Sequence, residues 1–281
     1  MKNINLIALK KQQGFSFIEL LIALAIGLFL LAGIATSYAT SKGSSIKRDQ
    51  FSVLEDNGRL ALEIISRVVE HTGYSPGGLT ITPFITAPSD VVSDTCPDGT
   101  GTQNVIDTSI FSATTDNAGG DTLSVIYQAD NNMFTDCTGG VLPAGCRLSP
   151  IPGINAIPEA SKIYNTFVRN TVTDTLECAG SRYGLKQVIA EGVENIQYLY
   201  GIDTINDSVV KVDRYVNASN VAGRWSDVVS IQIAILVRSL KPVKLIAEST
   251  EYTLLDEVIT TPTDRYNRAV FSTTVHLRNT L

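Results

Sequence analysis

An apolar run near the N-terminus carries no charged residue from Leu20 to Ser41. At about 1.5 Å per residue, a helix over this run is long enough to span the hydrocarbon core of a bilayer. One carboxylate, Glu19, stands directly before the run. An isolated carboxylate in hydrocarbon costs on the order of 2.5–3.5 kcal/mol, and such residues are usually retained because another group pairs with them. The pattern therefore predicts a membrane-spanning helix and a partner for Glu19.

The helical pattern continues beyond the apolar run. Apolar positions recur at alternating spacings of four and three residues, which predicts one buried stripe on an amphipathic stem helix; the stripe is Leu54, Gly58, Ala61, Ile65 and Val68. Gly43 is a predicted weak point of this helix. Gly73 and Pro76 predict its end, because glycine caps helix C-termini and proline blocks continuation.

The rest of the chain has the pattern of strands and turns. Residues 227–239 alternate strictly between apolar and other side chains, which predicts a strand buried on one face in an antiparallel sheet. Further strands are predicted at 122–129, 163–170, 171–180, 195–203 and 269–279 from their β-branched and aromatic content. One long helix followed by a strand-rich domain is an α+β organisation.

The charge balance disfavours one class of partner. The net charge is −6, and the first fourteen residues hold three lysines and no acid, so the remainder carries −9. This balance disfavours nucleic acid as a partner, and none is expected, because phosphate binding needs a basic face. The same balance disfavours an anionic membrane surface as the docking site of the downstream region.

The four cysteines all follow the apolar run. None forms a C-x-x-C pair, and only His71 and His276 are available as imidazole ligands, so zinc is not predicted. Outside the cytoplasm, two disulfides with three possible connectivities are expected. The alternative is four buried thiols.

No active site is predicted. The chain has no phosphate-binding glycine loop, no G-x-S-x-G elbow and no H-E-x-x-H motif. The acidic loops at Asp116–Asp121 and Asp130–Asp136 offer oxygen ligands that could bind calcium, but they lack EF-hand spacing and are predicted to be solvated turns. The carboxylate pairs Glu191/Glu194 and Asp256/Glu257 are predicted to be surface charges. We therefore expect no catalytic residue, no metal and no cofactor.

Three interpretations of the N-terminus compete. A secretory signal peptide cleaved near Ser37-Tyr38-Ala39 has the right composition, but the uncharged stretch is longer than it needs. A plain single-pass anchor leaves Glu19 unexplained. The third interpretation is a type IV prepilin, because "QQGFSFIEL" resembles the signal of that family: a basic leader that ends in Gly14, an aromatic Phe15, and Glu19 four residues later.

The resemblance implies a defined processing event. In the family a dedicated peptidase cuts after the glycine on the cytoplasmic side and methylates the new terminal amine, here on Phe15. The glutamate, here Glu19, is thought to neutralise the amine of a neighbouring subunit in the filament, which would offset much of the cost of its burial. Ser16 and Phe17 depart slightly from the commonest residues of the signal, without loss of the processing site.

The stem and the tail are similar to those of PilW-type minor pilins. "DNGR" at Asp56–Arg59 stands before an apolar helix that ends in Gly73-Tyr74, and the tail contains "EGVENIQYLYGID", a single tryptophan before a strand ending "LVRS", and "FSTTVHLRN". The family's D-C-x-G and L-x-C-x-G motifs match "DCTG" and "LECAG". The resemblance therefore implies the disulfides Cys137–Cys178 and Cys96–Cys146, whereas the sequence alone equally permits Cys137–Cys146.

The expected organisation follows from this resemblance. It consists of a cytoplasmic leader (1–14), a transmembrane and filament-core helix (15–40), an amphipathic stem (41–72) and a periplasmic β-rich domain (73–281) whose middle, about 79–160, is variable. The protein would be a single-pass inner-membrane prepilin that enters the pilus near its tip. It would prime pilus assembly with other minor pilins. Its other expected partners are the major pilin, the prepilin peptidase, the inner-membrane assembly platform and a tip adhesin.

Two other functions remain open at this point. A minor pseudopilin of a type II secretion system would share the leader, the stem and the fold. A periplasmic binding or adhesin domain would use the N-terminus merely as an anchor, and would then not require Glu19.

Overall fold

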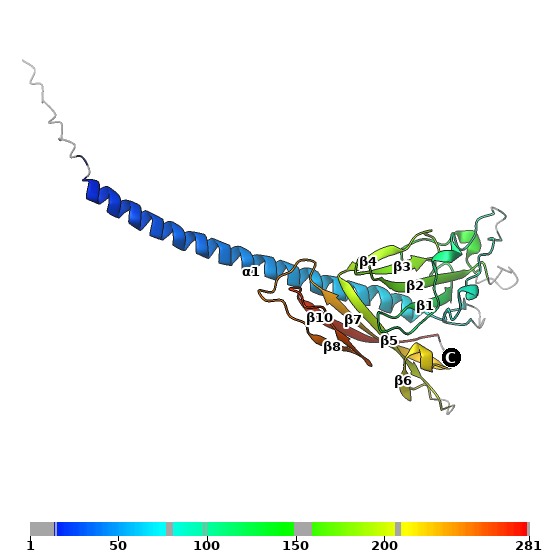
Figure 1. The fold of residues 1–281 in the computed structure, drawn as a ribbon. Helices are drawn as coiled ribbons and strands as arrows, with labels where there is room; N and C mark the ends of the chain where they lie inside the picture. Colours follow the sequence, from blue (N-terminus) through cyan, green and yellow to red (C-terminus); the bar gives the residue numbers. More distant parts are fainter. Residues whose placement is uncertain are drawn as a thin grey trace, which may run out of the picture. The chain divides into compact units, whose positions relative to one another are not determined.

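The computed structural model describes residues 14, 16–76, 81–97, 99, 101–148, 159–205 and 209–279. The chain divides into two compact units, Met1–Asp49 and Gln50–Leu281, and each is described by itself. Helix α1 (Phe17–His71) begins in the first unit and ends in the second (Figure 1). No break occurs at Gly43, so the weak point predicted there is not seen.

In the second unit, α1 buries one stripe of side chains. The buried residues are Gln50, Leu54, Gly58, Ala61, Ile65, Val68 and Val69. This confirms the predicted stripe, since all five of its members are among them. The helix ends at His71, and Gly73 follows with a φ of +73°. The amide of Gly73 donates to the carbonyl of Ile126 at 2.9 Å, so the predicted glycine stop also ties the helix end to a strand.

The first sheet has four antiparallel strands in the order β1-β2-β3-β4. They are β1 (Leu123–Gln128), β2 (Lys162–Asn170), β3 (Thr175–Gly180) and β4 (Gln187–Glu191). The predictions at 122–129 and 163–170 are confirmed. The prediction at 171–180 was too long, because residues 171–174 form the turn between β2 and β3, with Asp174 at a φ of +50°.

The second sheet is also antiparallel, in the order β10-β7-β5-β6. Its strands are β5 (Val193–Ile202), β6 (Arg214–Val216), β7 (Val228–Arg238) and β10 (Arg268–His276). A separate hairpin joins β8 (Glu251–Leu254) to β9 (Glu257–Thr260). Short 3-10 turns lie at Pro88–Asp90, Thr108–Ile110, Ala144–Cys146, Ala218–Asn220 and Trp225–Asp227.

Strand β7 corrects one expectation, because it is buried on both faces. Ile231, Ile233 and Ile235 enter the main core, as the alternation predicted. On the other face, Ala234 and Leu236 are also buried, in a small cluster with Leu254, Tyr252, Leu255 and Ile259. The β8–β9 hairpin therefore covers the face that the pattern had left to solvent.

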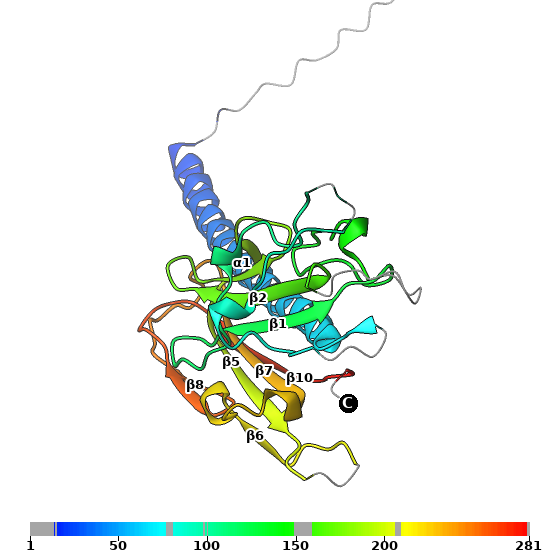
Figure 2. The same cartoon turned by 90° about the vertical axis from the view of Figure 1, so that its right-hand side faces the viewer.

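One main core joins α1 to both sheets. Residues of the stem stripe share it with β1–β4 of the first sheet and with β5, β7 and β10 of the second. Figure 2 separates the green strands β1 and β2 from the yellow-to-red strands β5, β7 and β10, with the cyan end of α1 beside both sets. The fold class is α+β, as predicted: a long N-terminal helix followed by an antiparallel, strand-rich domain.

Candidate functional site

The first turn of α1 is capped by Glu19. The amide of Ser16, the residue before the helix, donates to Oε2 of Glu19 at 3.2 Å, and the amide of Leu20 donates to the carbonyl of Ser16 at 3.2 Å. This is half of a capping box. A negative carboxylate in the first turn also interacts favourably with the positive end of the helix dipole. Gly14 is exposed, and Phe15 lies outside the described residues.

The large apolar side chains of the first unit are exposed. Every large apolar side chain of residues 17–38 is at least 46% exposed. The mean hydropathy of the best 18-residue window in α1 is 2.6, and by length and composition this helix is able to cross a membrane. A continuous apolar surface of this size in a soluble monomer is rare, so a bilayer or other helices are expected to cover it.

Two threonine hydroxyls within this apolar segment are bonded to the helix itself. Thr36 donates to the carbonyl of Gly33 and Thr40 to that of Thr36, each at 2.9 Å. Such internal bonds let a hydroxyl enter hydrocarbon without an unmet donor. The charged carboxylate of Glu19, directly before the uncharged run, is then the most costly group to bury here.

Two disulfides are present in the second unit. They join Cys96 to Cys146 and Cys137 to Cys178, with Cα–Cα distances of 4.5 and 6.4 Å. These are the pairs that the family resemblance implies. The alternatives left open by the sequence, Cys137–Cys146 and four free thiols, are not what the structure contains.

The second disulfide lies beside a carboxylate held against glycine. Oδ1 of Asp136 accepts from the amides of Thr138 and Gly140 at 3.0 and 2.8 Å, and Oδ2 accepts from the amide of Arg182 at 2.8 Å. A Cβ at Gly180 would come within 2.5 Å of Cγ of Asp136. The "DCTG" and "LECAG" motifs are therefore one structural unit, in which Asp136 caps a turn and Gly180 leaves room for it.

The tips of the acidic loops, at 117–119 and 131–132, are exposed as predicted, but three carboxylates at the loop ends are not solvated. Asp121, Asp130 and Asp136 are buried. Asp121 accepts from the amides of Asn117 and Tyr198 at 2.7 and 2.8 Å, and Asp130 accepts from two amides in its own turn. Turn amides lower the cost of burying these carboxylates. In the described part of the chain, no three His, Cys, Asp or Glu side chains are grouped to hold a metal ion.

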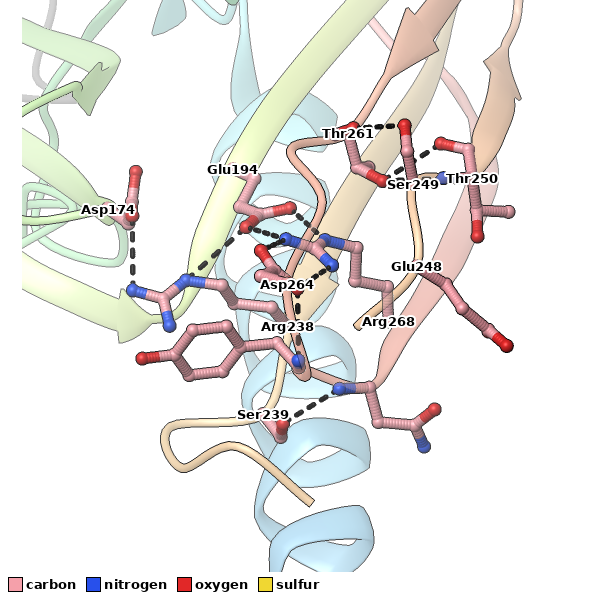
Figure 3. Close-up of polar contacts among 12 residues, drawn as sticks. Asp174, Glu194, Arg238, Ser239, Glu248, Ser249, Thr250, Thr261, Asp264 and Arg268 are labelled. Atoms are coloured by element: carbon pink, nitrogen blue, oxygen red, sulfur yellow. Dashed lines mark hydrogen bonds and ion pairs between the residues drawn. The ribbon is translucent and has the colours of Figure 1, made fainter. Parts of the chain in front are cut away.

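An ion-pair cluster joins the two sheets, and it corrects the prediction for Glu194 (Figure 3). Glu194 is no surface charge, since it binds the guanidinium of Arg268 through two bonds of 2.5 and 2.8 Å. Arg268, whose side chain is 1% exposed, also binds Asp264 twice, at 2.7 and 2.5 Å. Arg238 contacts Glu194 and reaches Asp174, in the turn after β2, at 3.1 Å.

The carboxylate partners of Arg268 favour the charged form of its guanidinium. Burial alone would lower the pKa of Arg268, but the hydrogen bonds to Asp264 and Glu194 outweigh burial and raise it. The hydrogen bond from Arg268 in turn lowers the pKa of Asp264. All of these groups are held by one another, so loss of any one of them would leave a buried charge without its partner.

Two segments of the chain match known families. Residues 9–35, which contain Gly14, Phe15 and Glu19, match the prokaryotic N-terminal methylation motif. Residues 159–279, from just before β2 to just after β10, match the type IV pilus-assembly protein W family.

The chain belongs to the PilW type IV pilus-assembly family.

Other comparisons are more distant. A type IV-like pilin from Thermus thermophilus matches 80% of this chain and 97% of its own length, with 13% sequence identity and a TM-score of 0.40. Among curated proteins, none matches the chain.

The two matched segments contain some of the features described above and leave others out. The PilW region holds strands β2–β10, Cys178 and the ion-pair cluster, whereas the middle of the chain and the stem at 41–72 lie outside both matches. The methylation motif and the apolar helix are those of a prepilin anchored in the inner membrane with its globular part outside the cytoplasm. Pilins are in general structural proteins, and the partners implied are those of the pilus machinery.

Proposed function

We propose that this PilW protein is a minor pilin that primes type IV pilus assembly in a complex with other minor pilins and stands near the pilus tip. Its partners would be the other minor pilins, the major pilin, the assembly platform and a tip adhesin. Membership of the PilW family supports a role in pilus assembly. The size of the globular unit, Gln50–Leu281, supports the tip, because steric crowding between repeated subunits grows with domain size.

The proposed organisation of the chain is the one expected from its sequence. Residues 1–14 would be a cytoplasmic leader, 15–40 the transmembrane and filament-core helix, 41–72 the stem, and 73–281 the periplasmic domain. The peptidase would cut after Gly14 and methylate the amine of Phe15.

The observation that carries the proposal is the position of Glu19. Its carboxylate caps the helix through the amide of Ser16, one residue after the amine that cleavage would create. A carboxylate offers about four acceptor positions, so one bond to its own helix leaves capacity for a neighbour's charged amine. That pairing would stabilise a carboxylate among packed apolar helices, where an unpaired one is costly.

The experiment that tests this role replaces the carboxylate. In cells that carry Glu19→Ala or Glu19→Gln, we expect the protein to insert into the inner membrane at its normal level while pilus assembly fails. The control is Glu63→Ala, because Glu63 is an exposed carboxylate of the same helix, paired with Arg67 at 2.9 Å. Normal piliation in the Glu19 variants would overturn the pairing argument and favour an anchor without an assembly role.

A deletion strain shows whether the protein acts in type IV pilus assembly or in type II secretion. Loss of pili and of twitching motility is the expected outcome. Loss of protein secretion with normal pili would instead assign the chain to a type II secretion system as a minor pseudopilin.

A further inference from the structure

The loop between β7 and β8, residues 240–247, exposes two adjacent bulky apolar side chains. Leu245 is 82% exposed and Ile246 is 71% exposed. Lys241 is exposed close by, and Lys244, paired with Glu248 at 3.7 Å, lies between it and the apolar pair. Isolated apolar residues are common on protein surfaces, but two adjacent ones beside lysines form the pattern of an interfacial contact.

Hydrogen bonds hold the base of the loop in a defined conformation. The amides of Val243 and Lys244 both donate to the carbonyl of Arg265, at 2.8 and 2.9 Å. The guanidinium of Arg265 donates back to the carbonyl of Lys244 at 2.7 Å. Ser239 accepts from the amide of Asn267 and donates to the carbonyl of Lys241. The fold therefore holds the base of the loop in place while Leu245 and Ile246 remain in solvent.

The loop is tethered close to the membrane segment. The amide of Lys241 donates to Oε1 of Gln50 at 2.8 Å, and Gln50 is buried. Nine residues of α1 separate Gln50 from Ser41, the last residue of the uncharged run. Nine helical residues are about 14 Å long. Chain connectivity therefore keeps Gln50, to which the base of the loop is hydrogen-bonded, near the end of the uncharged run.

We propose that loop 240–247 contacts the phospholipid surface of the membrane that anchors the chain, with Leu245 and Ile246 at the boundary between headgroups and acyl chains and Lys241 at the headgroup phosphates. The net acidity of the domain argues against a broad electrostatic contact, but a contact through one loop depends on local chemistry. The proposal rests on the membrane anchoring that is part of the proposed function. Extraction of the subunit into a filament would release this contact.

Site-directed tryptophan fluorescence tests the contact in the full chain. The protein is reconstituted in vesicles of phosphatidylethanolamine and phosphatidylglycerol, with or without phospholipids brominated on their acyl chains, which quench nearby tryptophan. Three variants are compared: Leu245→Trp, Leu185→Trp and Phe29→Trp. The emission of the native Trp225, present in all three, is subtracted with the unsubstituted chain.

Leu185 is the matched control, since it is also an exposed leucine of the second unit, at 72%. It precedes β4, whose other end leads to Gly192, the carbonyl of which accepts from the amide of Arg238 at the origin of the loop. Leu185 therefore lies beyond the far end of β4 from loop 240–247. Phe29 reports insertion of the apolar helix.

The expected result is quenching in the Phe29→Trp and Leu245→Trp variants and none in Leu185→Trp. Quenching of Phe29→Trp without Leu245→Trp would overturn the loop contact and leave the anchoring intact, and the exposed pair would then be assigned to a protein partner such as a neighbouring pilin. Equal quenching of Leu245→Trp and Leu185→Trp would also overturn it. Absence of quenching in Phe29→Trp would overturn the anchoring itself.

Discussion

Gly58 of α1 lies directly against the aromatic ring of Phe271 on β10. A Cβ at position 58 would overlap Cγ, Cδ2 and Cε2 of that ring. Glycine in a helix interior costs about 1 kcal/mol relative to alanine, so its presence here is offset by the close packing that it allows. Gly58, a member of the predicted stripe, is therefore a point of close packing between α1 and β10.

Gly58→Ala is therefore expected to destabilise the second unit. Overpacking of a well-filled core typically costs about 1–3 kcal/mol, which exceeds the gain in helix propensity. The measurement is denaturant unfolding of the full chain in detergent, followed by the fluorescence of Trp225. Gly43→Ala is the control on the same helix, where a Cβ would meet nothing within 4 Å, and it should leave stability unchanged or slightly raised. Equal effects of the two variants would refute the packing argument.

Gly180→Ala is expected to disturb the turn beside the Cys137–Cys178 disulfide. The added methyl would press on the carboxylate of Asp136, which three backbone amides hold in place, so a loss of about 1–3 kcal/mol is expected. Gly184→Ala is the matched control, because its Cβ would meet only Ile106, at an ordinary 3.7 Å. Comparison of their unfolding midpoints under non-reducing conditions decides the matter, and a harmless Gly180→Ala would contradict the close contact.

The sequence predicted the helix and the longer strands because each carries a periodic pattern of its own. It missed β4, β6, β8 and β9, which are three to five residues long, too short for a pattern to stand out from turn residues. The second buried face of β7 was missed for the same reason: it depends on the β8–β9 hairpin, a partner that no local pattern revealed.

Arg268→Ala is expected to be the most destabilising single change in the cluster. It would leave the carboxylates of Glu194 and Asp264 partly buried and without their main partner, and loss of one side of a buried ion pair typically costs about 3–5 kcal/mol. Arg67→Ala is the control: its pair with Glu63 is exposed, and such pairs contribute about 0–1 kcal/mol. Thermal unfolding of both variants provides the comparison. A cost for Arg268→Ala as small as that for Arg67→Ala would contradict the dependence of Glu194 and Asp264 on this guanidinium.

Asp121 predicts a pH dependence of stability. Burial raises the pKa of its carboxyl to about 7, despite two backbone amides that lower it, and Asp116 and Asp256 raise it further. The unfolded chain has an aspartate pKa of about 3.9, so between pH 4 and pH 7 the folded state binds more protons. The free energy of unfolding should therefore fall as pH rises through this window, by at most about 1.4 kcal/mol per pH unit, and level off above pH 7.

Asp121→Asn isolates this contribution. The variant is expected to be less stable, because an amide group would face one of the two donor amides. Its unfolding free energy should nevertheless lose the slope between pH 4 and pH 7. A slope that persists unchanged in the variant would assign the pH dependence to other groups.

Some residues of the candidate site were predictable from the sequence, and the roles of others were not. Gly14, Phe15 and Glu19 stand in one contiguous motif, so local spacing was enough to single them out. Glu194 was taken for a surface charge because its main partner, Arg268, lies 74 residues away in the chain. The capping roles of Asp121 and Asp136 likewise depend on turns whose amides only the folded backbone brings together.

The most direct test of the central claim is the intact mass and N-terminal peptide of the protein recovered from its native membrane. The account predicts a chain that begins at an N-methylated Phe15 and retains Glu19 in its first turn. A chain that begins near Thr40 would contradict it, because a signal peptidase would then have removed Glu19 together with the apolar helix.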